Sequence, residues 1–245
     1  MSTPTTPRGL LFGSAAESYE RFRLNYPDEV VDRTLTFADR PVTEGVEVGA
    51  GTGKATRAFA SRGIHVTALE PDPEMCTVLT RETLAMPVSP VHTTFEEYDG
   101  KPCGLVYAAA AMHWTEPASR WRRVHDLLEE GGVTAVFGCP MELSDPEVAE
   151  RVREARRPQL EEDDYAHEFD AGMAASGLFT DIEHHVVERE TVLPQREYVG
   201  YLSTVSAYLM LPLEDRQHVL RRIADAMPEQ VRVDASVGMT LGRRA

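Results

Sequence analysis

The residues best suited to chemistry lie in the stretch 46–70. One acid, Glu47, sits inside a short apolar run, and a second, Glu70, ends the next apolar run. Between them glycines recur at alternate positions: Gly49, Gly51 and Gly53. Such a backbone can turn tightly and let a ligand approach, because no Cβ atoms intervene. A carboxylate after a strand can accept hydrogen bonds from two ribose hydroxyls at once. The pattern predicts a pocket for an adenosine-like ligand.

Three classes of ligand compete for this glycine turn. A P-loop requires G-x-x-x-x-G-K-[ST], but Val48 occupies the first glycine position and Ala55 the Ser/Thr position. A dinucleotide fingerprint requires G-x-G-x-x-G, and Gly53 comes one position too early for its third glycine. S-adenosylmethionine has no phosphate and needs acceptors for an amino group and a ribose. Glu47 suits that ligand and would be unfavourable beside a pyrophosphate, so we favour S-adenosylmethionine.

The elements that must position these residues alternate along the first 140 residues. Apolar runs predict strands at 45–48, 64–69, 88–94, 105–110 and 133–137. Helical patterns occupy 15–22, a segment beginning at Asp28, 54–61, 73–83 and 119–128. This alternation predicts parallel strands with right-handed crossovers. We expect an α/β fold, a doubly wound, mostly parallel, Rossmann-like seven-stranded sheet with helices on both faces.

Beyond residue 140 the alternation ends. Residues 141–165 are acidic and predict a helical insert over the sheet. Further helices are expected at 167–175, 196–209 and 213–226, and single strands over 182–193 and 230–241 would close the far edge of the sheet. Because no repeat or linker divides the chain, we expect one domain, 1–245. Its expected parts are an N-terminal helical lid (1–40), a cofactor-binding core (41–140), the insert (141–165), and a C-terminal sheet edge with acceptor-side helices (166–245).

Five motifs follow one another in order: AAESYERFRLNYP, EVGAGTG with the later LEPD, LVYAAAAMHW, LLEEGGVTAVF and EYVGYLSTVSAYLML. This ordered set resembles the class I S-adenosylmethionine-dependent methyltransferases of the type 11/25 group, and the resemblance covers most of the chain. The first motif is similar to the family's Y-x-x-x-R-P-x-Y-P segment. The resemblance implies an enzyme that uses S-adenosyl-L-methionine and forms S-adenosyl-L-homocysteine.

The resemblance also implies which residues bind the cofactor. Glu47 lies near its amino group, Glu70 holds the ribose hydroxyls, and Tyr19 in the lid reaches its carboxylate. The remaining expected contacts are the turn residues Gly49, Ala50, Gly51 and Gly53, then Pro71 and Met75, then Thr94 and Phe95 beside the adenine, and Ala108 and Ala109 beneath the methionine end. The chain departs from the family where Thr94-Phe95 replaces Asp-Ala and Cys103-Gly104 replaces Phe-Asp.

His113 is the candidate general base. Methyl transfer is an in-line displacement in which proximity and alignment dominate, and a base is needed only when the acceptor loses a proton. His113 follows the fourth predicted strand; the alternative is a structural histidine that orders this loop. Expected acceptor-binding residues are Tyr26, His113, Trp114, Tyr201 and Tyr208. Core packing is the alternative for the last two, which belong to a hydroxyl-rich helical stripe.

Composition restricts the partners. A formal net charge of −15 over 245 residues repels phosphate backbones and anionic lipid, so neither nucleic acid nor a membrane is an expected partner. Three scattered cysteines suit a reducing compartment, and no metal site is expected. No apolar run approaches the ~20 residues of a membrane span. We expect a cytoplasmic monomer or homodimer.

The expected reaction is methylation of a small molecule at oxygen or nitrogen, with carbon as a further option. An Arg- and Pro-rich chain with only two lysines, Lys54 and Lys101, suggests a high-GC bacterium and, as a hypothesis, secondary-metabolite tailoring. Three alternatives stay open: a non-methylating enzyme on the same fold, a binding protein with a vestigial pocket, and a nucleotide-dependent oxidoreductase.

Overall fold

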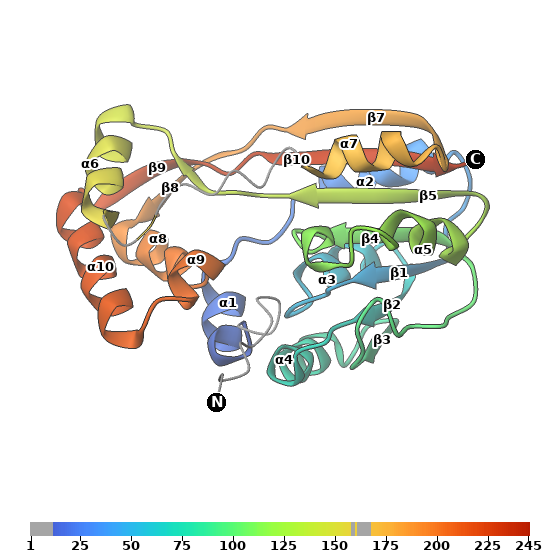
Figure 1. Ribbon diagram of the computed structural model, residues 1–245, viewed down its shortest axis with the longest axis horizontal. Helices are drawn as coiled ribbons and strands as arrows, with labels where there is room; N and C mark the ends of the chain where they lie inside the picture. Colours follow the sequence, from blue (N-terminus) through green and yellow to red (C-terminus); the bar gives the residue numbers. More distant parts are fainter. Residues whose placement is uncertain (1–11, 158–159, 161–167) are drawn as a thin grey trace. The chain divides into compact units, whose positions relative to one another are not determined.

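The computed structural model describes residues 12–157, 160 and 168–245, which form two compact units (Figure 1). The larger unit comprises Asn25–Cys139, Asp164–Val187 and Val237–Ala245. The smaller unit is drawn from Met1–Leu24, Pro140–Asp163 and Glu188–Ser236. The chain therefore leaves the larger unit and returns to it, and each unit is made of segments distant in sequence. The expected division into lid, core, insert and C-terminal part stays a prediction.

The larger unit is built on a seven-stranded sheet of order β3-β2-β1-β4-β5-β10-β7. Its first five strands pair in parallel: β1 (Glu44–Val48), β2 (His65–Leu69), β3 (Val88–Val91), β4 (Cys103–Ala109) and β5 (Leu128–Gly138). The last two are β7 (Phe179–Val187) and β10 (Val237–Arg244). β10 lies between β5 and β7 and pairs antiparallel with both. The predicted Rossmann-like, mostly parallel α/β sheet is confirmed.

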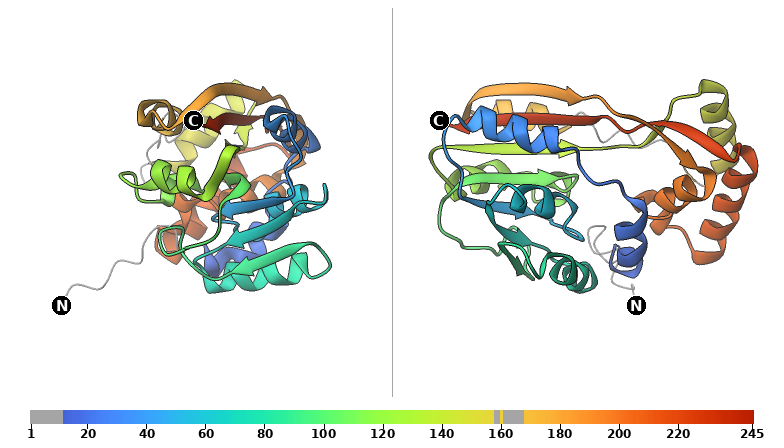
Figure 2. Two further views of the ribbon diagram at one scale, coloured as in Figure 1. Left: turned by 90° about the vertical axis from the view of Figure 1, so that its right-hand side faces the viewer. Right: turned by 180° about the vertical axis from the view of Figure 1, so that it is seen from behind.

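Successive side chains of a strand point to opposite sides of the sheet. Because apolar side chains lie on both sides, helices cover both faces. On β4, Leu105 and Tyr107 lie in one apolar core, whereas Val106 and Ala108 lie in the other. The first core receives side chains from α2 (Asp28–Ala38), α3 (Lys54–Ala60) and α4 (Pro73–Thr83). The second receives them from α5 (Arg120–Leu127) and α7 (Glu168–Ser176). Figure 2 shows these helices from two further sides.

The smaller unit contains a three-stranded antiparallel sheet that the sequence patterns did not predict. Its order is β6-β9-β8, from β6 (Glu142–Leu143), β9 (Gln230–Asp234) and β8 (Glu190–Pro194). Its helices are α1 (Ala16–Phe22), α6 (Pro146–Arg156), α8 (Gln195–Leu202), α9 (Ser206–Leu209) and α10 (Leu213–Ala226). The helix expected over 196–209 is thus two segments. The last residues of the predicted insert, 161–165, lie outside the described residues.

The single strands predicted over 182–193 and 230–241 are wrong, because each stretch is divided between two sheets. β7 and β8 are separated at Glu188 and Arg189, and β9 and β10 at Ala235 and Ser236. The two breaks face each other: the Ala235 amide donates to the Arg189 carbonyl (2.8 Å), and the Arg189 amide donates to Ser236 Oγ (3.1 Å). Apolar residues continue on both sides of each break, so periodicity alone does not reveal the change of sheet.

Leu105 tests the larger unit's core. It is fully buried on the central strand β4, so Leu105→Ala should leave a cavity and lower the free energy of unfolding by roughly 2–5 kcal/mol. The matched control is Leu84→Ala, since Leu84 is 79% exposed. Denaturant unfolding followed by circular dichroism measures both variants, and equal losses of stability would contradict this description of the core.

Candidate functional site

The turn between β1 and α3 places three glycines in the left-handed region. Their φ angles are 65° at Gly49, 58° at Gly51 and 90° at Gly53, a conformation that side chains rarely adopt. A Cβ atom at Gly49 would lie 2.6 Å from the Ala111 Cβ, and one at Gly53 would lie 2.8 Å from Leu79 Cδ1. Gly49 and Gly53 are therefore required by their left-handed backbone and by close packing within the chain. The sequence had suggested a different reason, the close approach of a ligand.

Glu70 joins the end of β2 to this turn. Its Oε2 accepts a hydrogen bond from the Gly51 amide at 2.7 Å, and its Oε1 accepts one from the Asp72 amide at 2.9 Å. Burial raises the pKa of Glu70 to about 7, although both amide donors oppose this rise. Each oxygen retains a second lone pair, so the carboxylate can still accept ribose hydroxyls.

Asp72 caps α4 and thereby orders the residues that follow Glu70. Its Oδ1 accepts hydrogen bonds from the amides of Glu74 (2.9 Å) and Met75 (3.1 Å). Among the expected cofactor contacts, Met75 is buried at the start of α4, Pro71 is half-buried beside Glu70, and Ala50 is buried within the turn. These residues surround the same backbone corner.

Glu47 lies on β1 with its side chain beneath α3, and it is 1% exposed. Its Oε2 accepts hydrogen bonds from Thr56 Oγ1 at 2.5 Å and from the Tyr107 hydroxyl at 3.0 Å. Its Oε1 is buried and has no hydrogen-bond partner among the described residues. Burial raises the pKa of Glu47 to about 8, and the two hydroxyl donors only partly oppose this. A buried polar atom without a partner is unfavourable, so a cationic ligand group there would be stabilising.

The expected adenine and methionine contacts lie after β3 and on β4. Phe95 is buried; its carbonyl accepts a hydrogen bond from Arg123 Nε (3.1 Å), whose guanidinium lies 5.4 Å from the Phe95 ring centroid. Thr94 lies beyond the end of β3, which is shorter than predicted, and its hydroxyl accepts from the Glu97 amide (3.2 Å). Ala108 is fully buried, and Ala109 is the last residue of β4.

His113 and Trp114 form a short 3-10 turn after β4. Ala110, with a φ of 53°, redirects the chain where β4 ends. The two rings lie 4.2 Å apart between centroids, at an interplanar angle of 47°, and both residues are half-buried. Because β1, β2 and β4 are parallel neighbours, their carboxyl ends share one edge of the sheet. The structure thus brings the glycine turn, Glu70 and His113 to this edge.

The expected tyrosine contacts are divided between the two units. Tyr26, in the larger unit, packs edge-to-face on Phe137 with centroids 5.0 Å apart. In the smaller unit, the Arg23 guanidinium lies 4.9 Å from the Tyr19 ring centroid and 4.7 Å from that of Tyr201. Tyr201 is buried and its hydroxyl accepts from the Met141 amide at 3.1 Å. Arg23 is therefore held by aromatic rings rather than on a solvated helix face.

Tyr208 is also buried in the smaller unit, and burial raises the pKa of its hydroxyl. The burial of Tyr201 and Tyr208 agrees with the packing alternative, and their role in acceptor binding stays a prediction.

Two residues near the glycine turn were missed by sequence reasoning. Thr56 and Tyr107 bind the Glu47 carboxyl, but they come from α3 and β4. The sequence offers one weak signal, a tyrosine in an otherwise aliphatic buried strand whose hydroxyl needs a partner. Only the pairing of β1 with β4, which sets Glu47 beside Tyr107, identifies that partner.

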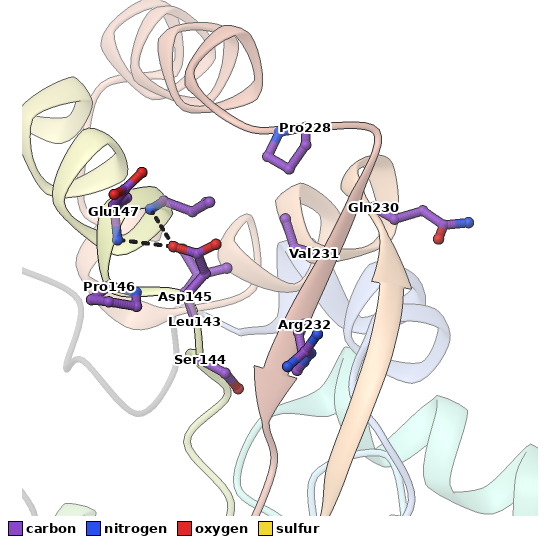
Figure 3. Close-up of a pocket in the computed structure, with 10 residues that line it drawn as sticks. Leu143, Ser144, Asp145, Pro146, Glu147, Pro228, Gln230, Val231 and Arg232 are labelled. Atoms are coloured by element: carbon purple, nitrogen blue, oxygen red, sulfur yellow. Dashed lines mark hydrogen bonds between the residues drawn. The ribbon is translucent and has the colours of Figure 1, made fainter.

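The smaller unit also contains a groove of about 620 Å³ between α6 and β9 (Figure 3). Asp145 lines it and caps α6 by accepting from the amides of Glu147 (2.9 Å) and Val148 (3.2 Å). Arg232 of β9 lies across the groove (Figure 3). None of the expected cofactor or acceptor residues lines it.

Within the described residues, no group of three or more His, Cys, Asp or Glu side chains is arranged to hold a metal ion. The helices in this part of the chain are too short or too polar to span a bilayer.

Glu47→Gln should change how stability depends on pH. Because the folded pKa (about 8) exceeds the ordinary value of 4.5, the protonated acid contributes stability below pH 4.5 that is lost as the pH rises towards 8. Relative to wild type, the variant should gain on the order of 2–4 kcal/mol between pH 5 and pH 8. Chemical unfolding at several pH values measures this, with exposed Glu74→Gln as the control. Parallel pH profiles for wild type and Glu47→Gln would contradict the burial argument.

Comparisons with known proteins agree with this geometry. Residues 46–136 match the family model described as a methyltransferase domain. An uncharacterized methyltransferase of Mycobacterium tuberculosis is 30% identical over 233 residues, which are 95% of this chain and 91% of the relative. A structure described as a type II methyltransferase of Anaeromyxobacter dehalogenans has a TM-score of 0.68 at 22% identity, covering 91% of this chain and 98% of that one.

A second structure shares the fold. Phosphoethanolamine N-methyltransferase 2 of Haemonchus contortus, solved with phosphomonomethylethanolamine and S-adenosylhomocysteine, has a TM-score of 0.56 at 14% identity and covers 95% of this chain and 57% of that one. Both structural likenesses support the fold alone, whereas the mycobacterial relative matches nearly the whole of both chains. This chain therefore belongs to the class I S-adenosylmethionine-dependent methyltransferases, and S-adenosylmethionine is its cofactor.

Proposed function

We propose that this enzyme methylates a small-molecule acceptor at oxygen or nitrogen, with carbon as a further option. The observation that carries the proposal is the pair of buried acids on either side of the left-handed glycine turn. Glu70 retains lone pairs for two ribose hydroxyls, and Glu47 retains one unpartnered oxygen for an ammonium. Neither acid suits a phosphate, so these two hydrogen-bond acceptors fit S-adenosylmethionine better than a nucleotide.

The chain's own residues would then hold and align the reactants. When bound, S-adenosylmethionine supplies an electrophilic methyl group on its sulfonium sulfur. Glu47 and Glu70 would hold that cofactor, and its methyl group would pass to a lone pair of the acceptor while the electron pair of the carbon–sulfur bond stays with sulfur. His113 would take the proton that an attacking hydroxyl or amine gives up, and Trp114 would form part of the acceptor pocket.

The acceptor is most simply a small, non-polymeric molecule. The net charge of −15 disfavours polyanions such as nucleic acids. The Haemonchus enzyme, which shares the fold, was solved with a small phosphorylated amine. The Arg- and Pro-rich, Lys-poor composition suggests a high-GC bacterium. On that basis we propose natural-product tailoring as the context. Tyr26 remains a proposed aromatic contact for such a molecule within the larger unit.

A metabolite screen with methyl-labelled S-adenosylmethionine tests the reaction. We expect label to appear in a small molecule together with stoichiometric S-adenosylhomocysteine. Glu70→Ala should lower cofactor affinity and labelling by roughly 10- to 100-fold, because charged hydrogen bonds of about 1.5–3 kcal/mol are lost. The control is Glu74→Gln, whose exposed side chain lies in the first turn of α4. Cofactor that binds but is never consumed would favour a non-methylating enzyme, and absence of binding would favour a vestigial pocket.

His113→Ala separates the catalytic from the structural alternative for this histidine. If His113 accepts the proton, kcat should fall by roughly 10²–10⁴-fold while calorimetric affinity for S-adenosylhomocysteine stays near the wild-type value. The loss should also shrink as the pH rises, because the acceptor then ionises without help. The control is Glu74→Gln, whose exposed side chain lies in the first turn of α4 and should leave kcat near the wild-type value. A loss of cofactor affinity in His113→Ala equal to the loss of kcat would indicate a loop-ordering role.

A further inference from the structure

The hydrogen bonds to Glu47 are distributed unequally between its two oxygens. Thr56 Oγ1 (2.5 Å) and the Tyr107 hydroxyl (3.0 Å) both donate to Oε2. A carboxylate oxygen offers two lone pairs, so these donors saturate Oε2. Oε1 is equally buried and has no hydrogen-bond partner within the described residues. One oxygen of this carboxyl is thus held by two hydroxyls, and the other is buried without a hydrogen-bond partner among the described residues.

Both donors are themselves held in place. Thr56 is fully buried on α3, and its β-branched side chain has few rotamers. The Tyr107 ring is fully buried and stacks on Phe59 at 4.2 Å and on Phe137 at 6.3 Å between centroids. The aromatic stack prevents the hydroxyl from swinging away. A helix and a neighbouring strand therefore fix the orientation of an acid on β1.

The surroundings of Glu47 favour a neutral carboxyl when no cation is present. Burial is the largest influence and raises its pKa, and the nearby Glu70 carboxylate raises it further. Arg57 on α3 lowers it, as do the Thr56 and Tyr107 hydroxyls. Together these influences raise the pKa of Glu47 to about 8 in the empty site. An ammonium at Oε1 would favour the charged form.

We propose that Thr56 and Tyr107 are positioning residues that hold Oε2 of Glu47 so that Oε1 accepts from the cofactor's ammonium, and that cofactor binding expels the Glu47 proton to solvent. The carboxylic O–H bond breaks, the proton leaves to the buffer, and the resulting carboxylate pairs with the ammonium. This inference rests on the proposed cofactor site and adds to it a coupling between binding and pH.

The coupling has a definite sign. Below pH 8 the empty site must lose a proton before the ion pair forms, so affinity for S-adenosylhomocysteine should rise up to tenfold per pH unit between pH 6 and 8 and then level off. Methylthioadenosine lacks the ammonium and keeps the ribose. Its affinity should report Glu70 and not Glu47, so the difference between the two ligands isolates the proposed contact.

Calorimetry of the wild-type protein provides the first test. Titrations at pH 7 in phosphate and in Tris, which differ in ionisation enthalpy, give the number of protons released on binding. We expect nearly one more proton with S-adenosylhomocysteine than with methylthioadenosine, and no such difference in Glu47→Gln. Equal proton release with both ligands in the wild type would overturn the inference. Absence of binding by either ligand would instead reject the proposed cofactor site.

Variants of the two donors provide the second test. Tyr107→Phe and Thr56→Val should each weaken S-adenosylhomocysteine binding about tenfold, since a hydrogen bond to a charged group is lost. They should leave the affinity for methylthioadenosine unchanged. They should also raise the pH at which the affinity for S-adenosylhomocysteine levels off. Thr56→Ser, which keeps the hydroxyl, should restore binding. An equal loss for both ligands, or no loss for either, would show that the donors have only a structural role.

Discussion

Two hydrogen bonds that Glu70 accepts from backbone amides hold the corner on which the proposed cofactor site depends. They tie the end of β2 to the turn after β1 and to the cap of α4. The turn itself needs a left-handed backbone at three glycines, a conformation that has little stability of its own. The Glu70 carboxylate compensates by giving the Gly51 amide an acceptor. One side chain thus fixes the local structure and also presents the lone pairs that a ribose would use.

Burial of two acids at one sheet edge lowers the stability of the folded protein. Burial raises the pKa values of both Glu47 and Glu70, which means that each carboxylate is less favourable here than in water. Each acid is only partly compensated by the protein, through amides for Glu70 and hydroxyls for Glu47. Sites that bind cations or hydroxyls commonly keep such incomplete compensation until the ligand completes it. The electrostatics therefore agree with the assignment to the methyltransferases.

The smaller unit is organised by a different interaction. Arg23 lies against the rings of Tyr19 and Tyr201 and donates from Nε to Thr204 Oγ1 (2.9 Å) and from Nη2 to the Thr204 carbonyl (3.1 Å). This cation–π and hydrogen-bond cluster joins α1 to the segment after α8, which are far apart in the sequence. A guanidinium suits this position because it stacks on rings and donates in its plane at the same time.

Local patterns were sufficient for the first half of the chain. Alternating apolar runs predicted β1, β2, β4 and β5 and the helices between them, because each βα unit carries its own hydrophobic period and glycine or proline stop signals. The same reading located Glu47, the glycines and Glu70, since their spacing within one βα unit is set by local geometry. Failed P-loop and dinucleotide spacings then favoured S-adenosylmethionine as the ligand.

The remaining features depend on contacts between distant segments. The division of residues 182–193 and 230–241 between two sheets follows from hydrogen bonds between Arg189, Ala235 and Ser236, which no periodicity encodes. The burial of Tyr201 follows from packing against Arg23 and the Met141 backbone. The sequence by itself determined the family and the fold class, and it singled out Glu47 and Glu70 as the proposed acids of the cofactor site. Tertiary structure decided which oxygen of Glu47 is left open, because Thr56 and Tyr107 meet that carboxyl only when β1, α3 and β4 pack together.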